Sequence, residues 1–514
     1  MSIFKKVIAG VCCLCTAFSM VACGGGGQTN FQSEVVDLEQ DILSGSLNIR
    51  VWDGGFGLKW LDNVIVEFNE KYPDVDIEVY DSTERQQVFG DIVGKGEKYD
   101  IIFSDALLSD YAEECLEPID DVYAYTNKGE SSAVGDKLID IYRKYLNNKG
   151  HYYQLPSQVG TYGIVYNNDY IKDEQVPVTT EELKALCKTI KGVKPFIFSG
   201  EAGTNYWNYI YSTWFAQYEG RDAYSAALSG QIIDETGALK YDPKSTYLDG
   251  SLKAMQVCED LLWYSNNNIV TNSTGLQFII AQRDFLKGQA AMMYNGSWLF
   301  NEMELMFPNG PESDFKMMKV PVISAIKEKC TTIEDDVELA ALVRAIDAGE
   351  TSFDGVNEAD FATVKDARAF FYAGAEGATG VVPINARNKQ LAKRFLSFMY
   401  SETGIKAHAS SMVGCILPVK DFNVDIDTEN TFMETSYQIL LNNEVFFNNP
   451  VIAIEPTCTE TVAGMIEKQF GSQNSADRTR AVDSFEAKKT LWTQNDNEKF
   501  WNTLISMGYI KERP

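Results

Sequence analysis

Histidine is nearly absent from this chain of 514 residues, which carries only His151 and His408. A zinc centre built from several histidines is therefore excluded, and a catalytic histidine would have to be one of these two. The six cysteines that follow Cys23 are widely scattered and form no C-x-x-C pair, so a cysteine metal site or a thioredoxin-like motif is not expected. We expect these cysteines to be mostly buried thiols, and we predict neither a metal nor a cofactor.

Basic residues are also scarce, because 45 Lys and Arg stand against 73 Asp and Glu and leave a net charge of -28. A surface this acidic repels nucleic acid, which is excluded as a partner. Beyond the N-terminal segment, no run reaches the 18 apolar residues that suggest a membrane span. With 45% hydrophobic and 23% charged residues, the remainder has the composition of a folded protein, and its length suggests two or three domains.

The N-terminus has the anatomy of a secretion signal, since Lys5 and Lys6 precede an apolar segment at 7–21. The sequence Met-Val-Ala-Cys that ends at Cys23 resembles a bacterial lipobox, which implies that residues 1–22 are a signal peptide and that Cys23 carries lipid. Four glycines and a polar stretch make residues 23–45 a flexible tether. We therefore expect a lipid-anchored protein on the extracellular face of the cell membrane. The alternative is an ordinary cleaved signal in which Cys23 has no special role.

The body of the chain opens with a strand, helix and strand pattern. Residues 47–52 and 75–79 alternate like strands, 61–68 has helical spacing, and 101–103 is a short apolar run. This order predicts a parallel sheet covered by helices, which binds ligands at the carboxyl ends of its strands. The side chains that follow two of these strands are therefore candidate ligand contacts: Trp52, Asp53, Phe56, Ser104 and Asp105.

A second unit begins after residue 156, with a strand expected at 163–166. Thr179 and Glu182 form a capping box that predicts a helix after them. The aromatic residues at 206–215 are too many for one face of a helix, so some should meet solvent, another domain or a ligand. Residues 324–380 are acidic and poor in strand signal, and we interpret them as an insertion with helices at 337–346 and 362–372. An amphipathic helix is expected at 390–400.

One motif decides the interpretation of the sequence. Residues 285–298 read F-x-x-G-x-A-A-M-x-x-N-G-x-W, with a helix ending at Gly288, a strand of small residues, a sharp turn at Asn295 and Gly296, and Trp298 just beyond. This pattern of eight fixed positions resembles the signature of bacterial extracellular solute-binding proteins of ABC importers, in the carbohydrate-binding, maltose-binding-protein-like family 1. The segments at 68–73, 99–103, 163–169 and 388–396 resemble further parts of that family.

The resemblance implies an α/β fold of the periplasmic-binding-protein-like type II, with two α/β lobes, three hinge crossings and a ligand cleft between the lobes. The crossings are expected near 157–161, 319–323 and 400–403. The N-terminal lobe would then comprise 46–158 and 322–400, including the insertion at 324–380. The C-terminal lobe would comprise 160–320 and 402–514.

The resemblance also implies which residues hold the solute. The family's tryptophan at the position of Trp298 stacks on sugar, and aromatic rings suit the C–H faces of a sugar ring. Tyr206 and Trp207 fall where the family has an acidic and aromatic turn that lines the cleft, although Asn205 replaces the acid here. Two further candidates are Asn295, within the motif, and Glu376, beside the insertion.

We therefore predict a monomeric receptor, not an enzyme, that captures a mono- or oligosaccharide and delivers it to the transmembrane permease subunits of an ABC importer. The same fold could bind a non-sugar solute, such as a polyamine or a metal chelate, in place of a carbohydrate. A surface glycosidase is the remaining alternative, but the sequence has no nucleophile elbow, P-loop or metal signature. The acid-rich segment 421–429 lacks the glycine of a calcium-binding loop and is not predicted to bind calcium.

Overall fold

The computed structural model describes Leu38 and residues 43–513, with gaps at 95–97, 106–110, 201–205, 373–377, 423, 427–428, 442–443, 447–469, 473, 492–493 and 507. The signal peptide, Cys23 and nearly all of the expected tether lie outside these residues. Within the part of the chain that is described, no helix combines the length and the apolar character needed to cross a membrane. Five cysteines in these ranges, Cys115, Cys187, Cys258, Cys330 and Cys415, are free thiols, and all but Cys330 are buried.

The first sheet has the strand order β2-β1-β3-β14-β6. Its strands are β1 (Ser44–Trp52), β2 (Asp74–Ser82), β3 (Ile101–Ser104), β6 (Gln154–Pro156) and β14 (Thr379–Val381). β1 runs parallel to β2 and β3, whereas β14 is antiparallel to both β3 and β6. The predicted parallel strand-helix-strand unit is therefore present. The sequence pattern did not reveal the other two strands: β14, which runs antiparallel to the rest of the sheet, and β6 beside it, which runs in the same direction as β1, β2 and β3.

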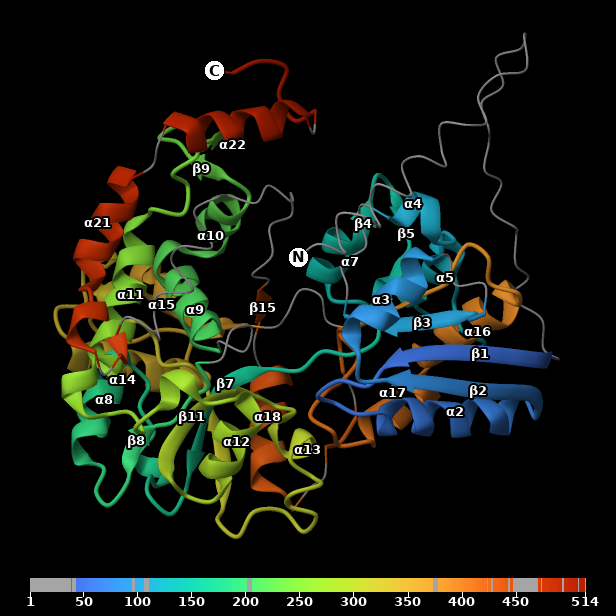
Figure 1. Cartoon of the computed structure of the whole chain (residues 1–514), viewed down its shortest axis with the longest axis horizontal. Coiled ribbons are helices and arrows are strands. Elements are labelled where there is room, and N and C mark those ends of the chain that lie inside the picture. The colour runs from blue at the N-terminus through green and yellow to red at the C-terminus, as the bar shows by residue number, and fades with distance from the viewer. Residues whose placement is uncertain are drawn as a thin grey trace. The chain divides into compact units, whose positions relative to one another are not determined.

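Helices cover both faces of this sheet (Figure 1). Ile101 and Phe103 of β3 point into a core with α2 (Lys59–Lys71), α16 (Lys389–Met399) and α17 (Glu402–Ala409). Ile102, between them, points to the opposite face, where α3 (Arg85–Val93) and α4 (Ala112–Cys115) pack. This alternation explains why the first three residues of β3 are all apolar, as in strands buried on both faces.

The second sheet has the order β12-β7-β11-β8 and is mixed. Its strands are β7 (Tyr162–Asn167), β8 (Lys194–Phe196), β11 (Ala290–Gly296) and β12 (Phe315–Met318). β7 is antiparallel to both β11 and β12, and β11 is parallel to β8. One face packs on α8 (Thr180–Thr189), α9 (Trp207–Glu219) and α11 (Asp249–Leu262), and the other on α12 (Phe278–Leu286) and α18 (Thr431–Leu441).

Helix α8 begins as predicted, because the Thr179 hydroxyl accepts a hydrogen bond from the backbone N–H of Glu182. Helix α9 holds the aromatic cluster and is apolar nearly all round, with Trp207, Tyr211, Trp214 and Phe215 buried in the second core. Such a helix lies inside a protein rather than on its surface. The expectation that some rings face a ligand applies only to its first turn, where Tyr206 and Tyr209 are less buried.

The predicted insertion belongs to the second core, which corrects the expected lobe limits. The 3-10 helix η4 (Ser324–Lys329), α14 (Asp336–Asp347), α15 (Glu358–Ala369) and Phe370 of β13 (Phe370–Tyr372) share the apolar core of β7 and α9. The passage to the first sheet therefore falls between Phe370 and Thr379, and not at 319–323. Leu339, Leu342 and Phe361 supply the apolar faces that hold this segment there.

The last passage also differs from the expected position at 400–403. Helix α17 packs on α2, and Cys415, Leu417 and Val419 remain in the first core, so the chain reaches the second sheet only with α18. Residues 157–161 lie between the end of β6 in the first sheet and the start of β7 in the second. The remaining elements are short or peripheral: α5 (Asp120–Ala124), α6 (Val134–Lys137), α7 (Asp140–Leu146), β4 (Asn147–Asn148), β5 (His151–Tyr152), η1 (Asp173–Gln175), α10 (Arg221–Leu228), β9 (Gln231–Ile233), β10 (Leu239–Tyr241), η2 (Tyr264–Asn266), η3 (Ser273–Gly275), α13 (Leu299–Glu302), β15 (Glu444–Phe446), η5 (Ser475–Asp477), α21 (Ala481–Leu491) and α22 (Gln494–Ser506).

Candidate ligand-binding cleft

A cavity of about 270 Å³ lies where the loops of the two sheets meet at the first passage. The first sheet contributes the residues after β1 and β3, the passage contributes 158–160, and the second sheet contributes the residues around β7, α9 and α13. We call this cavity the cleft. Its lining residues are Trp52, Gly54, Gly55, Phe56, Gly57, Asp105, Gln158, Val159, Gly160, Tyr162, Tyr206, Tyr209, Trp298, Glu302 and Ala378.

The glycine-rich loop at residues 54–57 brings the first sheet close to the second. A side chain at Gly55 would place its Cβ 2.9 Å from the indole of Trp298, so only glycine allows this approach. Gly57 has a φ of 61°, in the left-handed region that glycine adopts without strain. The amide of Asn301 on α13 donates a hydrogen bond of 2.7 Å to the carbonyl of Gly55. This loop and α13 therefore form one wall of the cleft together.

Trp298 stands at the centre of this wall. β11 ends at Gly296, and the chain turns at Ser297 and Trp298, two residues later than the turn predicted at Asn295 and Gly296. A Cβ on Gly296 would lie 2.2 Å from the Trp298 ring, so the indole rests on bare backbone there. The motif thus needs glycine before the tryptophan because the indole occupies the space of a side chain.

Aromatic rings surround the indole of Trp298. Its centroid lies 4.6 Å from that of Tyr162, 5.5 Å from that of Phe56 and 6.2 Å from that of Tyr206, each pair close to edge-to-face. Tyr209 adds a ring 4.6 Å from Tyr162. Burial raises the pKa of Tyr206 well above its usual value, and the indole N–H of Trp298 bonds its hydroxyl. The cleft therefore presents ring faces and edges with phenol hydroxyls among them, which suits a solute that is partly apolar and partly hydroxylated.

Gly160 lets the ring of Phe56 reach the passage between the sheets. A Cβ there would come within 2.3 Å of the Phe56 ring and 2.7 Å of the Ser297 hydroxyl. The same hydroxyl accepts from the N–H of Thr161 at 3.1 Å and donates to the carbonyl of Gly414 at 2.6 Å. The backbone on both sides of the cleft floor is thereby fixed.

Two carboxyl groups face the cleft in different surroundings. Glu302 accepts a hydrogen bond of 2.7 Å from the amide of Gln282, and burial raises its pKa from 4.5 to about 7. Asp105 contacts Arg85 at 2.6 Å. Burial raises the pKa of Asp105, and the guanidinium of Arg85 opposes that shift. The negative charge of Asp105 is therefore compensated by a cation, whereas Glu302 has a neutral partner.

The structure brings five of the predicted site residues into the cleft lining: Trp298, Tyr206, Trp52, Phe56 and Asp105. Two others, Asn205 and Glu376, lie outside the described residues. The remaining four, Trp207, Asn295, Asp53 and Ser104, are described but do not line the cleft.

Each of those four side chains has another place in the fold. Trp207 is 1% exposed and packs against Phe196 and Phe198 in the second core. The side-chain Oδ1 atom of Asn295 accepts a hydrogen bond from the N–H of Gly296 at the end of β11. Ser104 is buried in β3, paired with β14, and Asp53 has its pKa raised by partial burial and by the nearby charge of Asp81.

The sequence interpretation missed Tyr162, Tyr209, Gln158 and Glu302 as lining residues. A signal for Glu302 is present in the chain, since residues four apart on a helix share one face and Trp298 precedes Glu302 by one turn. Tyr209 likewise follows Tyr206 by three residues at the start of α9. The contribution of Tyr162 depends on the pairing of β7 with β11, which local spacing does not reveal.

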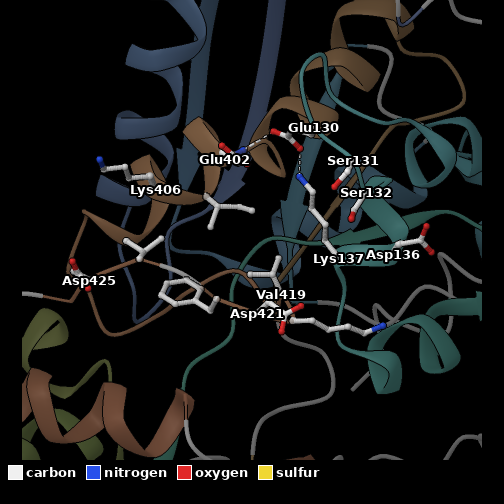
Figure 2. Close-up of a pocket in the computed structure, with 14 residues that line it drawn as sticks. Glu130, Ser131, Ser132, Asp136, Lys137, Glu402, Lys406, Val419, Asp421 and Asp425 are labelled. Carbon is white, nitrogen blue, oxygen red and sulfur yellow. Dashed lines mark hydrogen bonds and ion pairs between the residues drawn. The ribbon is translucent and has the colours of Figure 1, made fainter.

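A larger hollow of about 740 Å³ lies on the first core, between α6, α17 and residues 419–425. Figure 2 shows that Glu130 in this hollow already pairs with protein groups, because it contacts Lys137 and accepts from the N–H of Glu402 at 2.8 Å. Among the described lining residues, this hollow has one aromatic ring, that of Phe422, whereas the cleft has Trp298 and five other aromatic residues. The aromatic cleft, not this hollow, has the chemistry of a solute site.

Comparison with known proteins agrees with this architecture. Residues 63–423 match the family of bacterial extracellular solute-binding proteins, and the chain belongs to that family. The fold is that of a periplasmic binding protein of the maltose-binding type. A similar solved structure is the GacH receptor of Streptomyces glaucescens GLA.O, determined without ligand and with acarbose or an acarbose homologue. The two chains are 16% identical, with a TM-score of 0.56 over 87% of this chain and 98% of the receptor. The family is one of binding proteins rather than enzymes.

Proposed function

We propose that this protein is the receptor of an ABC importer for a sugar or oligosaccharide, and that the cleft is its solute site. The observation that carries the proposal is the aromatic lining: Trp298, Tyr162, Tyr206, Tyr209 and Phe56 converge on one cavity from both sheets. Rings bind the C–H faces of sugars, and the carboxylates, amide and phenol hydroxyls beside them can bond sugar hydroxyls. The receptor of similar fold binds acarbose, which agrees with a saccharide cargo.

Capture would occur by closure of the two lobes around the solute. The residues lining the cleft come from both sheets, so a solute that contacts both sides favours the closed form over the open one. The passages at 157–161, between Phe370 and Thr379, and between Val419 and Thr431 are the three hinge crossings in this proposal. The closed receptor would then deliver its solute to the permease subunits in the membrane.

We further infer that Cys23 carries the lipid that holds the receptor at the extracellular face of the membrane. The support is the sequence Met-Val-Ala-Cys after a short apolar segment, followed by a glycine-rich tether. Cys23→Ala should move the protein from the membrane fraction to the medium. A variant that stays with the membranes would contradict the anchor.

Thermal unfolding with a panel of neutral mono- and oligosaccharides tests the cargo. A ligand that binds the native state at a hundredfold excess over its Kd stabilises the protein by about 2.7 kcal/mol. We expect a rise in melting temperature with one class of saccharide, and we expect Trp298→Ala to abolish that rise. A rise with spermidine alone, with none for any saccharide, would reject the carbohydrate cargo and retain the receptor.

A further inference from the structure

The two acidic residues that line the cleft differ in whether a cation neutralises them, and this difference bears on the charge of the solute. The two charged side chains among the described lining residues are acidic, Asp105 and Glu302. Asp105 is neutralised by its contact with Arg85, 2.6 Å away. Glu302 receives only the amide of Gln282 at 2.7 Å, and no ion pair to it occurs within the described ranges. Among the described residues, therefore, no cationic side chain balances the Glu302 carboxyl group.

The position of Glu302 places this carboxyl group among aromatic rings. Trp298 is the N-cap residue of α13 and precedes Glu302 by one turn, and a Cβ on Gly55 would meet both the Trp298 ring at 2.9 Å and the Glu302 Oε1 atom at 3.1 Å. The hydroxyl of Tyr206 is near enough for the negative charge of Glu302 to raise its pKa. A cation next to this carboxylate would be attracted in two ways: by the negative charge of the carboxylate and by the quadrupoles of the neighbouring indole and phenol rings.

We propose that the solute is a saccharide that carries one protonated amine, and that Glu302 is the specificity-determining residue that receives the amine. This inference rests on the proposed function of the cleft as a sugar site. A single unbalanced carboxylate matches one cationic nitrogen, so a polyamine with several charges fits this cleft less well. A sugar acid fits worst, because its carboxylate would approach Glu302 and Asp105 with no cation of the described lining to receive it.

Titration calorimetry at pH 8 with matched sugars tests the proposal. Glucose and galactose are each compared as the neutral sugar, the 2-amino and 6-amino sugars, the N-acetylated amino sugar and the uronic acid, with spermidine as a separate probe. We expect an amino sugar to bind at least tenfold more tightly than its neutral parent and its N-acetylated form. Glu302→Gln should bring the amino sugar and its parent to within about twofold of each other. Glu304→Gln, which changes an exposed acid just beyond α13, should leave the preference intact.

The possible results separate this inference from the proposed function. Equal binding of neutral and amino sugars, or a preference that survives Glu302→Gln, overturns the role of Glu302 and leaves the sugar receptor standing. Tighter binding of the uronic acid or of spermidine also overturns the amine-bearing saccharide. Failure of every saccharide to bind rejects both the inference and the carbohydrate cargo.

Discussion

The side-chain amide of Asn301 donates to the carbonyl oxygen of Gly55 at 2.7 Å, and this bond joins the loop after β1 to the helix that begins after Trp298 and ends at Glu302. The loop follows a strand of the first sheet and the helix follows a strand of the second, so the bond links the two sheets within one wall of the cleft. Glycine at position 55 is required for the link, since a Cβ there would lie 2.9 Å from the indole of Trp298.

Gly55→Val should separate the loop from α13 and weaken solute binding at least tenfold, because its branched side chain occupies the space of the indole. The fold should survive, since Gly55 lies on a partly exposed loop outside both cores. Calorimetry with the bound saccharide measures the loss. Gly90→Val in α3 is the matched control, because a Cβ at Gly90 meets nothing within 4 Å. Unchanged affinity in Gly55→Val would mean that the contact plays no part in binding.

Two tryptophans that the sequence offers as cleft candidates should behave in opposite ways. Trp298→Ala removes the central ring of the cleft and should abolish solute binding with a small loss of stability. Trp207→Ala empties a site that is 1% exposed in the second core, and it should cost about 3–5 kcal/mol of unfolding free energy. Urea unfolding and calorimetry on both variants separate the two effects. A large loss of stability in Trp298→Ala alone would reverse these assignments.

The local signals in the sequence predicted the individual elements well. Alternation gave β1 and β2, the capping box gave α8, and helical spacing gave α2, α14 and α16 at nearly their observed limits. The motif at 285–298 also placed Trp298 beyond the end of β11, where it lines the cleft. These features depend on neighbours within a few turns of chain, which is the range over which sequence periodicity carries information.

The features that the sequence did not predict depend on distant pairing. Tyr162 reaches the cleft because β7 pairs with β11, more than a hundred residues away along the chain. The assignment of α14 and α15 to the second core likewise rests on apolar faces that fit there, and an amphipathic helix does not specify which core it covers. The family resemblance places Trp207 at a turn that lines the cleft, but the resemblance does not specify which way the side chain points, and here the indole lies in the second core.

The insertion should contribute directly to the stability of the second core. Leu342 on α14 is fully buried there, so Leu342→Ala should lower the free energy of unfolding by about 2–5 kcal/mol. Val337 on the same helix is 77% exposed, and Val337→Ala should change it by less than about 0.5 kcal/mol. Urea unfolding of both variants measures the difference. A small loss in Leu342→Ala would indicate that the insertion is detachable from the core.

Glu302 should make the unliganded protein less stable as the pH rises. Its pKa is about 7 in the folded chain because of burial, and 4.5 without that burial, so the folded state holds the extra proton between these values. The associated stability is present below pH 4.5 and is lost by about pH 7, with a full difference on the order of 3 kcal/mol. Glu302→Gln should therefore stabilise the protein relative to the wild type at pH 8 and change little at pH 4.5. Urea midpoints across this range measure the effect, and a constant difference between the two proteins would contradict it.

His408 should act in the opposite direction over the same range of pH. It is buried on α17, its Nε2 atom contacts the carbonyl of Ser157 at 2.8 Å, and burial lowers its pKa from 6.5 to about 4. The unfolded chain then binds the extra proton between pH 6.5 and 4, so stability is lost as the pH falls through this window, by up to about 3 kcal/mol. His408→Gln keeps a nitrogen donor for the carbonyl of Ser157, but glutamine does not titrate. The pH dependence of stability that His408 contributes should therefore vanish in this variant. The contributions of Glu302 and His408 to the pH dependence of stability oppose each other, so the stability of the wild type should vary less with pH than that of either variant. Between pH 4.5 and 7, the stability of His408→Gln should fall and that of Glu302→Gln should rise. Parallel profiles for all three proteins would show that neither group titrates as its surroundings imply.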